Sequence, residues 1–383
     1  MRPTLGYRML AAVIVAGMVF FNGPAAARAQ TTKAPADEWR LVEPKEVGLD
    51  PAALAKLVAA IRAGEYSDIH SLLVIRHDQL AVEEYFSGPD ERRDTAVGSR
   101  PVGNVQFNAD TLHDARSVTK SVVSILFGIA RSQNFVPGVD TPLLSLFPQY
   151  KDLRTPQRLK IQLRHVLSMS PGWKWDESSK AYGDPLNSET AMDHQPDRIR
   201  YILSQPIVQA PGEKFEYDGG TTVLLAAIIE HGTGMPIDRY AQKVLFGPLG
   251  ITHYEWLHYP DGAAIAASGL RLLPRDMAKI GLLYLHKGQW RGSAVVPASW
   301  VTESTSPHVP GDFYGYHWWL GKTSAGIDAV AVGYGGQRVL VDPGEDMVVV
   351  ITAGLYNDPQ QSQITNRILS QCTQAAGAKP DGH

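Results

Sequence analysis

Strand-like runs occur near both ends of the 383-residue sequence, and helical patterns fill the middle. Near the start, residues 71–75 and 80–86 are rich in β-branched and aromatic side chains. Three similar runs follow near the end, at 327–333, 338–341 and 347–352. If strands from both ends pair with one another, they make one sheet and leave the chain between them as an insertion. We therefore expect an α/β (α+β) fold with an antiparallel sheet flanked by helices, formed from both chain ends, and an inserted helical subdomain.

Helical spacing of apolar residues predicts most of the remaining elements. Helices are expected at 51–61, 117–132, 161–169, 197–204, 221–231, 237–245, 274–286 and 360–376. Residues 88–111 and 171–196 are predicted to be loops. A loop as long as 171–196 is usually functional in a compact domain.

The first thirty residues are typical of an export signal. Arg2 and Arg8 give a positively charged start, an apolar run follows at 9–21, and residues 27–29 (Ala-Arg-Ala) match a small-x-small cleavage pattern. We expect a periplasmic or secreted protein without a stable membrane span, although a retained anchor is the alternative. The expected division is a signal peptide at 1–29, a flexible lead-in at 30–37, one domain at 38–376 and a disordered tail at 377–383. Within that domain, the sheet part is expected at about 38–115 and 256–376, and the helical insertion at about 116–255.

Charge and cysteine content exclude several other classes of protein. The 36 Lys and Arg residues do not exceed the 39 Asp and Glu residues, so the basic face of a nucleic-acid binder is not expected. Cys372 is the single cysteine, which excludes a disulfide framework and a Cys-based zinc or iron–sulfur site. The sequence makes no prediction of the oligomeric state.

Ser117 and Lys120 form an S-x-x-K motif at the predicted start of the helix 117–132. Residues three apart share one face of a helix, with Cβ atoms about 5–6 Å apart, so the Lys120 amine can reach the Ser117 hydroxyl. A serine hydroxyl needs a nearby proton acceptor to become a nucleophile. The N–H groups at a helix start also favour a developing oxyanion. A capping serine beside a solvated lysine is the alternative interpretation of the motif.

Two later elements carry groups that suit the same chemistry. Tyr217 precedes the predicted helix 221–231, and a close ammonium group such as that of Lys120 would stabilise its phenolate and make it a base. Residues 333–337 (Gly-Tyr-Gly-Gly-Gln) include glycines that let a substrate approach the backbone, and an N–H there can complete an oxyanion hole. A structural tyrosine and a β-bulge are the respective alternatives.

In this order, the three elements resemble the serine β-lactamase and penicillin-binding-protein superfamily, in its class C-like branch. The resemblance is strongest to esterases and 6-aminohexanoate-dimer hydrolases, and it covers roughly residues 40–375. Residues 163–172, 246–250 and 268–285 also look like the family. A fold of the β-lactamase/transpeptidase type is therefore expected.

The resemblance also implies roles for the motif residues. Ser117 would be the acylated nucleophile, Lys120 its proton partner, and Tyr217 the base of the family's Y-x-N element. The oxyanion hole would consist of the N–H groups of Ser117 and Gln337.

Tyr334, Gly335 and Gly336 stand where lactamases carry K-T-G, and this is one of two departures from the lactamase pattern. The K-T-G lysine, which meets the lactam carboxylate, is Tyr334 here, and Gly219 replaces the Asn of Y-x-N, which holds the amide side chain of β-lactams. We expect esters and small amides to be better substrates than β-lactams. Asn at position 219 and Lys at position 334 should then restore lactam turnover. Tyr182 resembles a substrate-contacting tyrosine of the oligoamide hydrolases, with surface packing as the alternative.

These observations predict an exported serine hydrolase that cleaves carboxylic esters or small amides through an acyl-enzyme on Ser117. The expected partner is a small-molecule ester or amide, and no metal or organic cofactor is implied. A β-lactamase or a D,D-peptidase acting on cell-wall peptides is the enzymatic alternative. A catalytically inactive relative that binds peptidoglycan or a partner protein is the alternative from another class.

Overall fold

The computed structural model describes residues 39–95, 98–323 and 326–377. The predicted signal peptide and lead-in, and residues 378–383 of the predicted tail, lie outside these ranges. Within them, no helix combines the length and the hydropathy that a transmembrane span requires.

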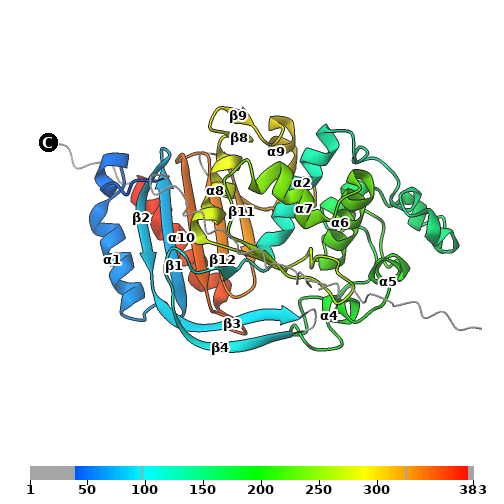
Figure 1. Ribbon diagram of the computed structural model, residues 1–383, viewed down its shortest axis with the longest axis horizontal. Coiled ribbons are helices and arrows are strands. Elements are labelled where there is room, and N and C mark those ends of the chain that lie inside the picture. Colours follow the sequence, from blue (N-terminus) through cyan, green and yellow to red (C-terminus); the bar gives the residue numbers. More distant parts are fainter. Residues whose placement is uncertain (1–38, 96–97, 324–325, 378–383) are drawn as a thin grey trace, which may run out of the picture. The chain divides into compact units, whose positions relative to one another are not determined.

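The main sheet has six antiparallel strands that come from both ends of the described chain (Figure 1). Its order is β10-β11-β12-β13-β1-β2. The strands are β1 (Ile69–Arg76), β2 (Gln79–Tyr85), β10 (Trp319–Thr323), β11 (Gly326–Gly333), β12 (Gln337–Asp342) and β13 (Met347–Ala353). Because β1 pairs with β13, the first and last parts of the chain share one sheet, and the predicted fold class is confirmed.

Helices cover both faces of this sheet (Figure 1). Successive side chains of a strand point to opposite faces, so β1 contributes to two cores. Leu72 packs in the core shared with α1 (Pro51–Arg62) and α10 (Gln361–Gly377), and Leu73 packs in the core shared with α8 (Pro274–Leu285). Burial on both faces explains why β1 is a nearly continuous apolar run.

A helical region lies between the two sheet-forming parts of the sequence. Its helices are α2 (Val118–Ser132), α3 (Leu163–Leu167), α4 (Ser188–Asp193), α5 (Arg198–Ser204), α6 (Gly219–Thr233) and α7 (Ile237–Ala241). Shorter turns are η1 (Pro44–Val47), η2 (Leu143–Ser145), η3 (Pro148–Leu153), η4 (Arg158–Lys160) and the π-helical η5 (Gln242–Phe246). The remaining elements are the strands β5 (His113–Asp114), β6 (Glu255–Trp256), β7 (Leu270–Leu272), β8 (Gln289–Trp290) and β9 (Ser293–Ala294), and the helix α9 (Ala298–Ser304).

Small residues on α2 fix this helix against its neighbours. The hydroxyl of Ser121 donates to the carbonyl of His317 at 2.7 Å, and that of Ser124 donates to the carbonyl of Tyr316 at 2.7 Å. A Cβ at Gly128 would lie 2.0 Å from the Trp300 ring, so only glycine fits there. These contacts fix the position of α2, and therefore also the position of Ser117, the residue just before the helix.

Two predicted loops contain regular structure. Residues 88–111 include most of the antiparallel hairpin of β3 (Ser87–Thr95) and β4 (Gly98–Gln106), and residues 171–196 include α4. The hairpin strands are polar and carry Pro and Gly, so they lack the alternating apolar pattern on which strand prediction depends. The six residues of α4 are too few to show helical periodicity; its start is fixed by Asn187, whose side chain accepts hydrogen bonds from two N–H groups of the first turn.

Candidate active site

The S-x-x-K serine stands directly before α2. Ser117 is the N-cap residue of this helix and is 8% exposed. Arg116, the residue before it, has a φ of 50°, which is unfavourable for a side chain with a Cβ. The Arg116 guanidinium donates to the Ser99 hydroxyl at 3.0 Å and lies 3.4 Å from Asp114. Such strain persists only where the surroundings hold it, and it is typical of functional sites.

Lys120 lies one turn along α2 with its amine at the serine. Its Nζ donates to Ser117 Oγ at 3.0 Å and to the carbonyl of Ala267 at 3.1 Å. The side chain is 2% exposed. Burial alone would lower the pKa of Lys120, but Tyr217 and two nearby carboxylates outweigh burial and raise the pKa above its ordinary value. Lys120 is therefore an ammonium group at neutral pH.

Tyr217 comes from the turn before α6 and meets the same amine. The Lys120 Nζ lies 5.0 Å from the centre of the Tyr217 ring, and Trp319 stacks on that ring at 6.0 Å. Burial raises the pKa of Tyr217, whereas Lys120 and the Ser117 hydroxyl lower it, and the net shift is upward. The resting site therefore holds an ammonium and a neutral phenol. The sequence expectation of a phenolate stabilised before the reaction does not agree with this charge state.

Two buried glutamates lie on the other side of Lys120. Glu177 Oε1 is 3.8 Å and Glu189 Oε2 is 3.5 Å from Nζ. Burial and the neighbouring Glu189 raise the pKa of Glu177 well above its ordinary value. Burial opposes ionisation of Glu189 as well, but Lys120 and Arg93 lower its pKa to about 2. The two carboxyl groups thus share one proton and carry one negative charge, because like charges this close do not both ionise.

The carboxyl groups of Glu177 and Glu189 fill the space beside Gly219, so this space is not open to a substrate. Its N–H donates to Glu177 Oε2 at 2.6 Å. A Cβ at position 219 would lie 2.2 Å from Glu189 Oε2 and 3.2 Å from Glu177 Oε2. The expectation that Asn at this position helps to raise lactam turnover is not supported, because the carboxyl groups of Glu189 and Glu177 would have to move to make room for its side chain.

The shared proton leads to a prediction about the two glutamates. In either single variant, Glu177→Gln or Glu189→Gln, the remaining carboxyl group ionises and keeps one negative charge beside Lys120. We expect each single variant to lower kcat/KM for an activated ester by less than about tenfold, and the double variant by about a hundredfold or more, because sites that act as a unit are non-additive. Without either carboxylate, the pKa of Lys120 falls, so activity that needs the ammonium is lost at a lower pH.

Kinetics between pH 6 and 10 test this charge assignment. The alkaline limb of the double variant should move to lower pH, while the limbs of both single variants stay near that of the parent. Circular dichroism must show that all three variants are folded. If the effects of the single variants simply multiply in the double variant, the two carboxyl groups act independently.

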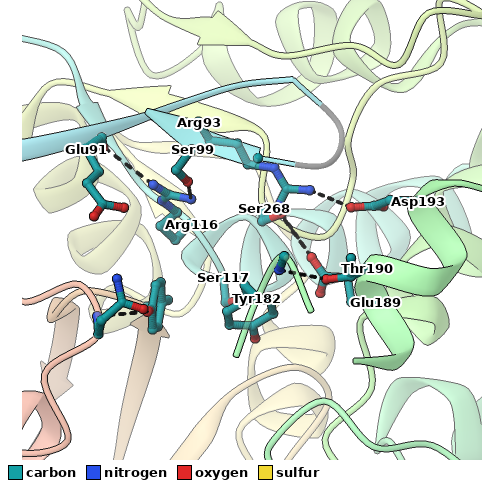
Figure 2. Close-up of a pocket in the computed structure, with 14 residues that line it drawn as sticks. Glu91, Arg93, Ser99, Arg116, Ser117, Tyr182, Glu189, Thr190, Asp193 and Ser268 are labelled. Atoms are coloured by element: carbon teal, nitrogen blue, oxygen red, sulfur yellow. Dashed lines mark hydrogen bonds and ion pairs between the residues drawn. The ribbon is translucent and has the colours of Figure 1, made fainter. Parts of the chain in front are cut away.

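The serine opens onto a cleft with two lobes that share Ser117, Tyr182 and Tyr334. The first lobe, of about 390 Å³, lies under the β3–β4 hairpin. Figure 2 shows Arg93 reaching from this hairpin toward Asp193, with which it pairs at 2.8 Å. The second lobe has a volume of about 610 Å³. Its lining includes Glu177, the chain segment 178–181, Phe215, Tyr217, Trp319, Gly333 and Arg338.

Tyr182 and Tyr334 stand between the two lobes. Their rings meet edge to face with 5.1 Å between centres. The Tyr182 hydroxyl donates to Glu177 Oε1 at 2.9 Å, and the Tyr334 hydroxyl donates to Asn357 Oδ1 at 2.7 Å. The structure thus places Tyr182 in the cleft, where it links the substrate space to the carboxyl pair.

The other residues of the predicted substrate strand face away from the cleft. The N–H of Gly335 donates to Gln361 Oε1 at 2.8 Å and that of Gly336 to the Gly333 carbonyl at 3.2 Å. Both glycines have a positive φ, so they make a tight turn between β11 and β12 and leave no approach for a substrate. Gln337 is fully buried, and its carboxamide bonds the backbone of Tyr334 and Ala353.

The lining of the cleft favours a different residue as the second oxyanion donor. Gln337 lines neither lobe, whereas Tyr334 follows the last residue of β11 and lines both lobes together with Ser117. This position makes the Tyr334 N–H the better partner for the Ser117 N–H. The expected assignment to Gln337 is not supported, because that residue is already part of β12.

Sequence analysis missed Glu177, Glu189 and the hairpin residue Arg93. Both glutamates lie in the segment 171–196, which was predicted to be a long functional loop. The length of this loop was the one feature of the sequence that could have indicated their importance. Nothing in the sequence indicates that Glu189 meets Lys120, because 69 residues separate them and no common motif spans them. Their contact depends on the packing of α4 and the hairpin against the start of α2.

Comparisons with known proteins identify the family of this chain. The family model described as Beta-lactamase matches residues 54–370. The curated relative esterase EstB of Burkholderia gladioli is 24% identical over 224 residues, which are 55% of this chain and 53% of that protein. A protein of Salmonella enteritidis PT4 named as a D-alanyl-D-alanine carboxypeptidase is 24% identical over 225 residues, or 56% of this chain and 49% of that protein. The chain thus spans about half the length of the curated relatives it matches.

Two solved structures support the fold. A protein from Bacillus anthracis named as a 6-aminohexanoate-dimer hydrolase superposes with a TM-score of 0.67 at 19% identity, covering 83% of this chain and 82% of that one. EstCE1, named as a hydrolase with promiscuous acyltransferase activity, superposes with a TM-score of 0.62 at 15% identity, covering 83% of this chain and 98% of that one. Both superpositions support a fold of the β-lactamase type.

Proposed function

The chain belongs to the Beta-lactamase family, and on this basis we propose that it is a serine hydrolase that cleaves carboxylic esters or small amides through an acyl-enzyme on Ser117. The observation that carries the proposal is the 3.0 Å contact between Lys120 Nζ and Ser117 Oγ at the start of α2, inside the cleft. A serine with an adjacent charged amine, in a strained turn, has the surroundings of an activated nucleophile.

The charge state of the site suggests how the proton moves. The ammonium of Lys120 donates to Ser117 Oγ, so the serine hydrogen is free to go to the oxygen of Tyr217. As Oγ attacks the substrate carbonyl carbon, Tyr217 accepts this proton and passes its own proton to the leaving oxygen or nitrogen. No net charge builds up on Tyr217, and the nearby ammonium stabilises any phenolate character in the transition state.

Charge on the substrate oxygen is met by backbone donors. We assign the oxyanion hole to the N–H groups of Ser117 and Tyr334. A water molecule later attacks the acyl-enzyme. Tyr217 accepts the water proton and passes its own proton to Ser117 Oγ, which leaves as the hydroxyl as the acyl carbon–oxygen bond breaks. The acid is released, and the site returns to its resting state.

Steric and electrostatic features of the cleft favour esters and small linear amides over β-lactams. The carboxyl pair fills the space beside position 219, where the side chain of Asn would lie. At position 334 a tyrosine bonded to Asn357 replaces the cation that would meet a lactam carboxylate. Each lost hydrogen bond to a charged group is worth about 1.5–3 kcal/mol, or about one to two powers of ten in rate when it is felt in the transition state.

The proposal predicts a substrate preference. We expect kcat/KM for p-nitrophenyl butyrate to exceed that for nitrocefin by at least about a hundredfold, because both contacts to the lactam are lost. Both substrates should be assayed on one preparation, with Ser117→Ala as the blank. If nitrocefin is hydrolysed as well as the ester, the β-lactamase alternative takes first place, and release of D-alanine from a cell-wall peptide would favour the D,D-peptidase.

Two further parts of the proposal concern the whole protein. We propose that it is exported to the periplasm or secreted, on the strength of the charged start, apolar run and cleavage pattern in residues 1–29. The alternative to an enzyme is a catalytically inactive relative that binds peptidoglycan or a partner protein. The contact between Ser117 and Lys120 favours an enzyme. A fluorophosphonate probe distinguishes the two, since only an enzyme with a reactive serine is labelled.

A further inference from the structure

A cluster of two histidines and an aspartate lies away from the nucleophile, where β1, β3 and β5 meet. His70 comes from β1, Asp90 from β3 and His113 from β5. One nitrogen or oxygen atom of each side chain lies within 4.8 Å of the other two. Both histidines are fully buried, and the Asp90 side chain is 9% exposed. The proposed hydrolysis uses none of these residues.

The hydrogen bonds of the two imidazoles leave a conflict between them. His70 Nε2 lies 3.1 Å from the Pro89 carbonyl, and His113 Nδ1 lies 3.2 Å from the Asp114 carbonyl. A carbonyl only accepts hydrogen bonds, so each of these nitrogens carries its ring's hydrogen. A neutral ring has only one N–H, so His70 Nδ1 and His113 Nε2 are both lone pairs. Yet these two atoms lie 2.8 Å apart, a distance at which two lone pairs repel each other unless a metal ion or a proton lies between them.

Asp90 supplies negative charge at the same place. Its Oδ1 lies 4.0 Å from His113 Nε2 and has no hydrogen-bond partner among the described residues. A buried carboxylate oxygen without a partner is costly. Two imidazole nitrogens and one carboxylate oxygen that lie within 4.8 Å of one another are a ligand set for a divalent transition metal ion.

The backbone around His70 is shaped to hold its ring. A Cβ at Gly354 would lie 2.7 Å from the His70 ring, and a Cβ at Gly88 would lie 3.0 Å from it. Phe107 stacks on the other face, with 3.9 Å between ring centres. These three contacts hold the ring in one orientation, as the partners of a ligating histidine do.

We propose that His70, Asp90 and His113 form a binding site for one divalent transition metal ion of the Zn²⁺ type. The two facing nitrogens are 2.8 Å apart. In a tetrahedral site with metal–nitrogen distances of about 2.0–2.1 Å they would lie ~3.3 Å apart, so the two rings would separate by about 0.5 Å when the ion binds. The carboxylate completes a three-ligand set with one negative charge.

The ion would tie the base of the hairpin to the sheet. Asp90 and Gly88 are hairpin residues, and Glu91, Arg93 and Ser99 of the same hairpin line the first lobe of the cleft. His113 lies four residues before Ser117. The role of the ion is thus structural: it joins three strands whose continuations form the wall of the substrate cleft and the turn before the nucleophile.

Metal titration of the untagged full-length protein tests this site. After dialysis against a chelator, calorimetry with ZnCl₂ should show one ion bound per chain, with a rise in the unfolding temperature. Co²⁺ in place of Zn²⁺ should give visible absorption bands, and Cu²⁺ should give an electron paramagnetic resonance spectrum with coupling to two nitrogens. Asp90→Asn should weaken Zn²⁺ binding at least tenfold, because it removes the only charged ligand.

Asp78→Asn is the matched control, since Asp78 pairs with the surface histidine His286 at 2.8 Å and lies outside the cluster. It should bind Zn²⁺ as the parent does. Equal binding by the parent and by Asp90→Asn would place the ion elsewhere and overturn the proposal. If Asp90→Asn does not fold, the measurements on the parent protein test the proposal by themselves. If the parent does not bind one Zn²⁺ tightly, or if Cu²⁺ shows no coupling to two nitrogens, a proton bridges the imidazoles and the proposal is wrong.

Discussion

Replacing Ser117 with Ala is expected to abolish formation of the acyl-enzyme and to lower kcat for an activated ester by about 10⁴–10⁶, as removal of a serine nucleophile does in other hydrolases. The remaining rate would come from substrate binding and the backbone oxyanion donors, which the substitution leaves in place. Stability should change little, because Ser117 caps α2 without a side-chain capping hydrogen bond. The loss would therefore be chemical and not structural.

Intact mass spectrometry measures the acyl-enzyme directly. Mixing the parent protein with p-nitrophenyl butyrate should add one butyryl group, and peptide mapping should find it on Ser117. Ser99→Ala is the matched control, because Ser99 also lines the cleft and its hydroxyl accepts a hydrogen bond from the Arg116 guanidinium. An adduct of the same yield on the Ser117→Ala variant would assign the nucleophile to another residue.

Local spacing was enough to predict the contact between Lys120 and Ser117. Ser117 and Lys120 are three residues apart on one helix, and this spacing alone brings the two side chains within reach. The paired strands at both ends were also predictable, because β1 and β13 are apolar runs bounded by turn residues. In each case the signal lies within one short segment of sequence.

The residues that set the charge of the site depend on packing between distant segments. Glu177 and Glu189 lie 57 and 69 residues after Lys120 along the chain, and no periodic pattern predicts that they approach it. Gly219 shows the consequence. From the sequence, this glycine was interpreted as the loss of a ligand-binding amide, but in the structure it is the space that the carboxyl pair occupies.

The polar hairpin was missed for a related reason. Strand prediction relies on apolar side chains that alternate between buried and exposed faces, and β4 is exposed along most of its length. Arg93, on β3, is held by Glu189 and Asp193, which are themselves in the mispredicted segment. Because residues 88–111 and 171–196 were both predicted to be loops, their contact with each other could not be predicted. The cluster of His70, Asp90 and His113 was missed for the same reason, since Asp90 lies on the hairpin.

Lys120 and Tyr217 are expected to act as one unit in catalysis. We expect Lys120→Met and Tyr217→Phe each to lower kcat/KM by about 10³–10⁴, and the double variant to lose little more than the worse single variant. The reason is the shared proton path: Tyr217 accepts the serine proton only while the ammonium of Lys120 stabilises its oxygen. When one of the two groups is removed, the proton of Ser117 can no longer be transferred by this route, and the remaining group contributes nothing to the rate.

Matched controls separate this coupling from loss of structure. Tyr314→Phe also removes a buried phenol, which donates to Met169 Sδ at 3.3 Å beside the site, and it should keep most of the activity. Lys279→Met removes another buried lysine, paired with Asp276 at 2.9 Å, and reports the cost in unfolding temperature of losing a buried ammonium. If the two catalytic substitutions multiply in the double variant, the groups act in separate steps. If Tyr217→Phe alone keeps most of the activity, the phenol is structural, and the proton of Ser117 must pass to Lys120, which would then have to be neutral when the serine attacks.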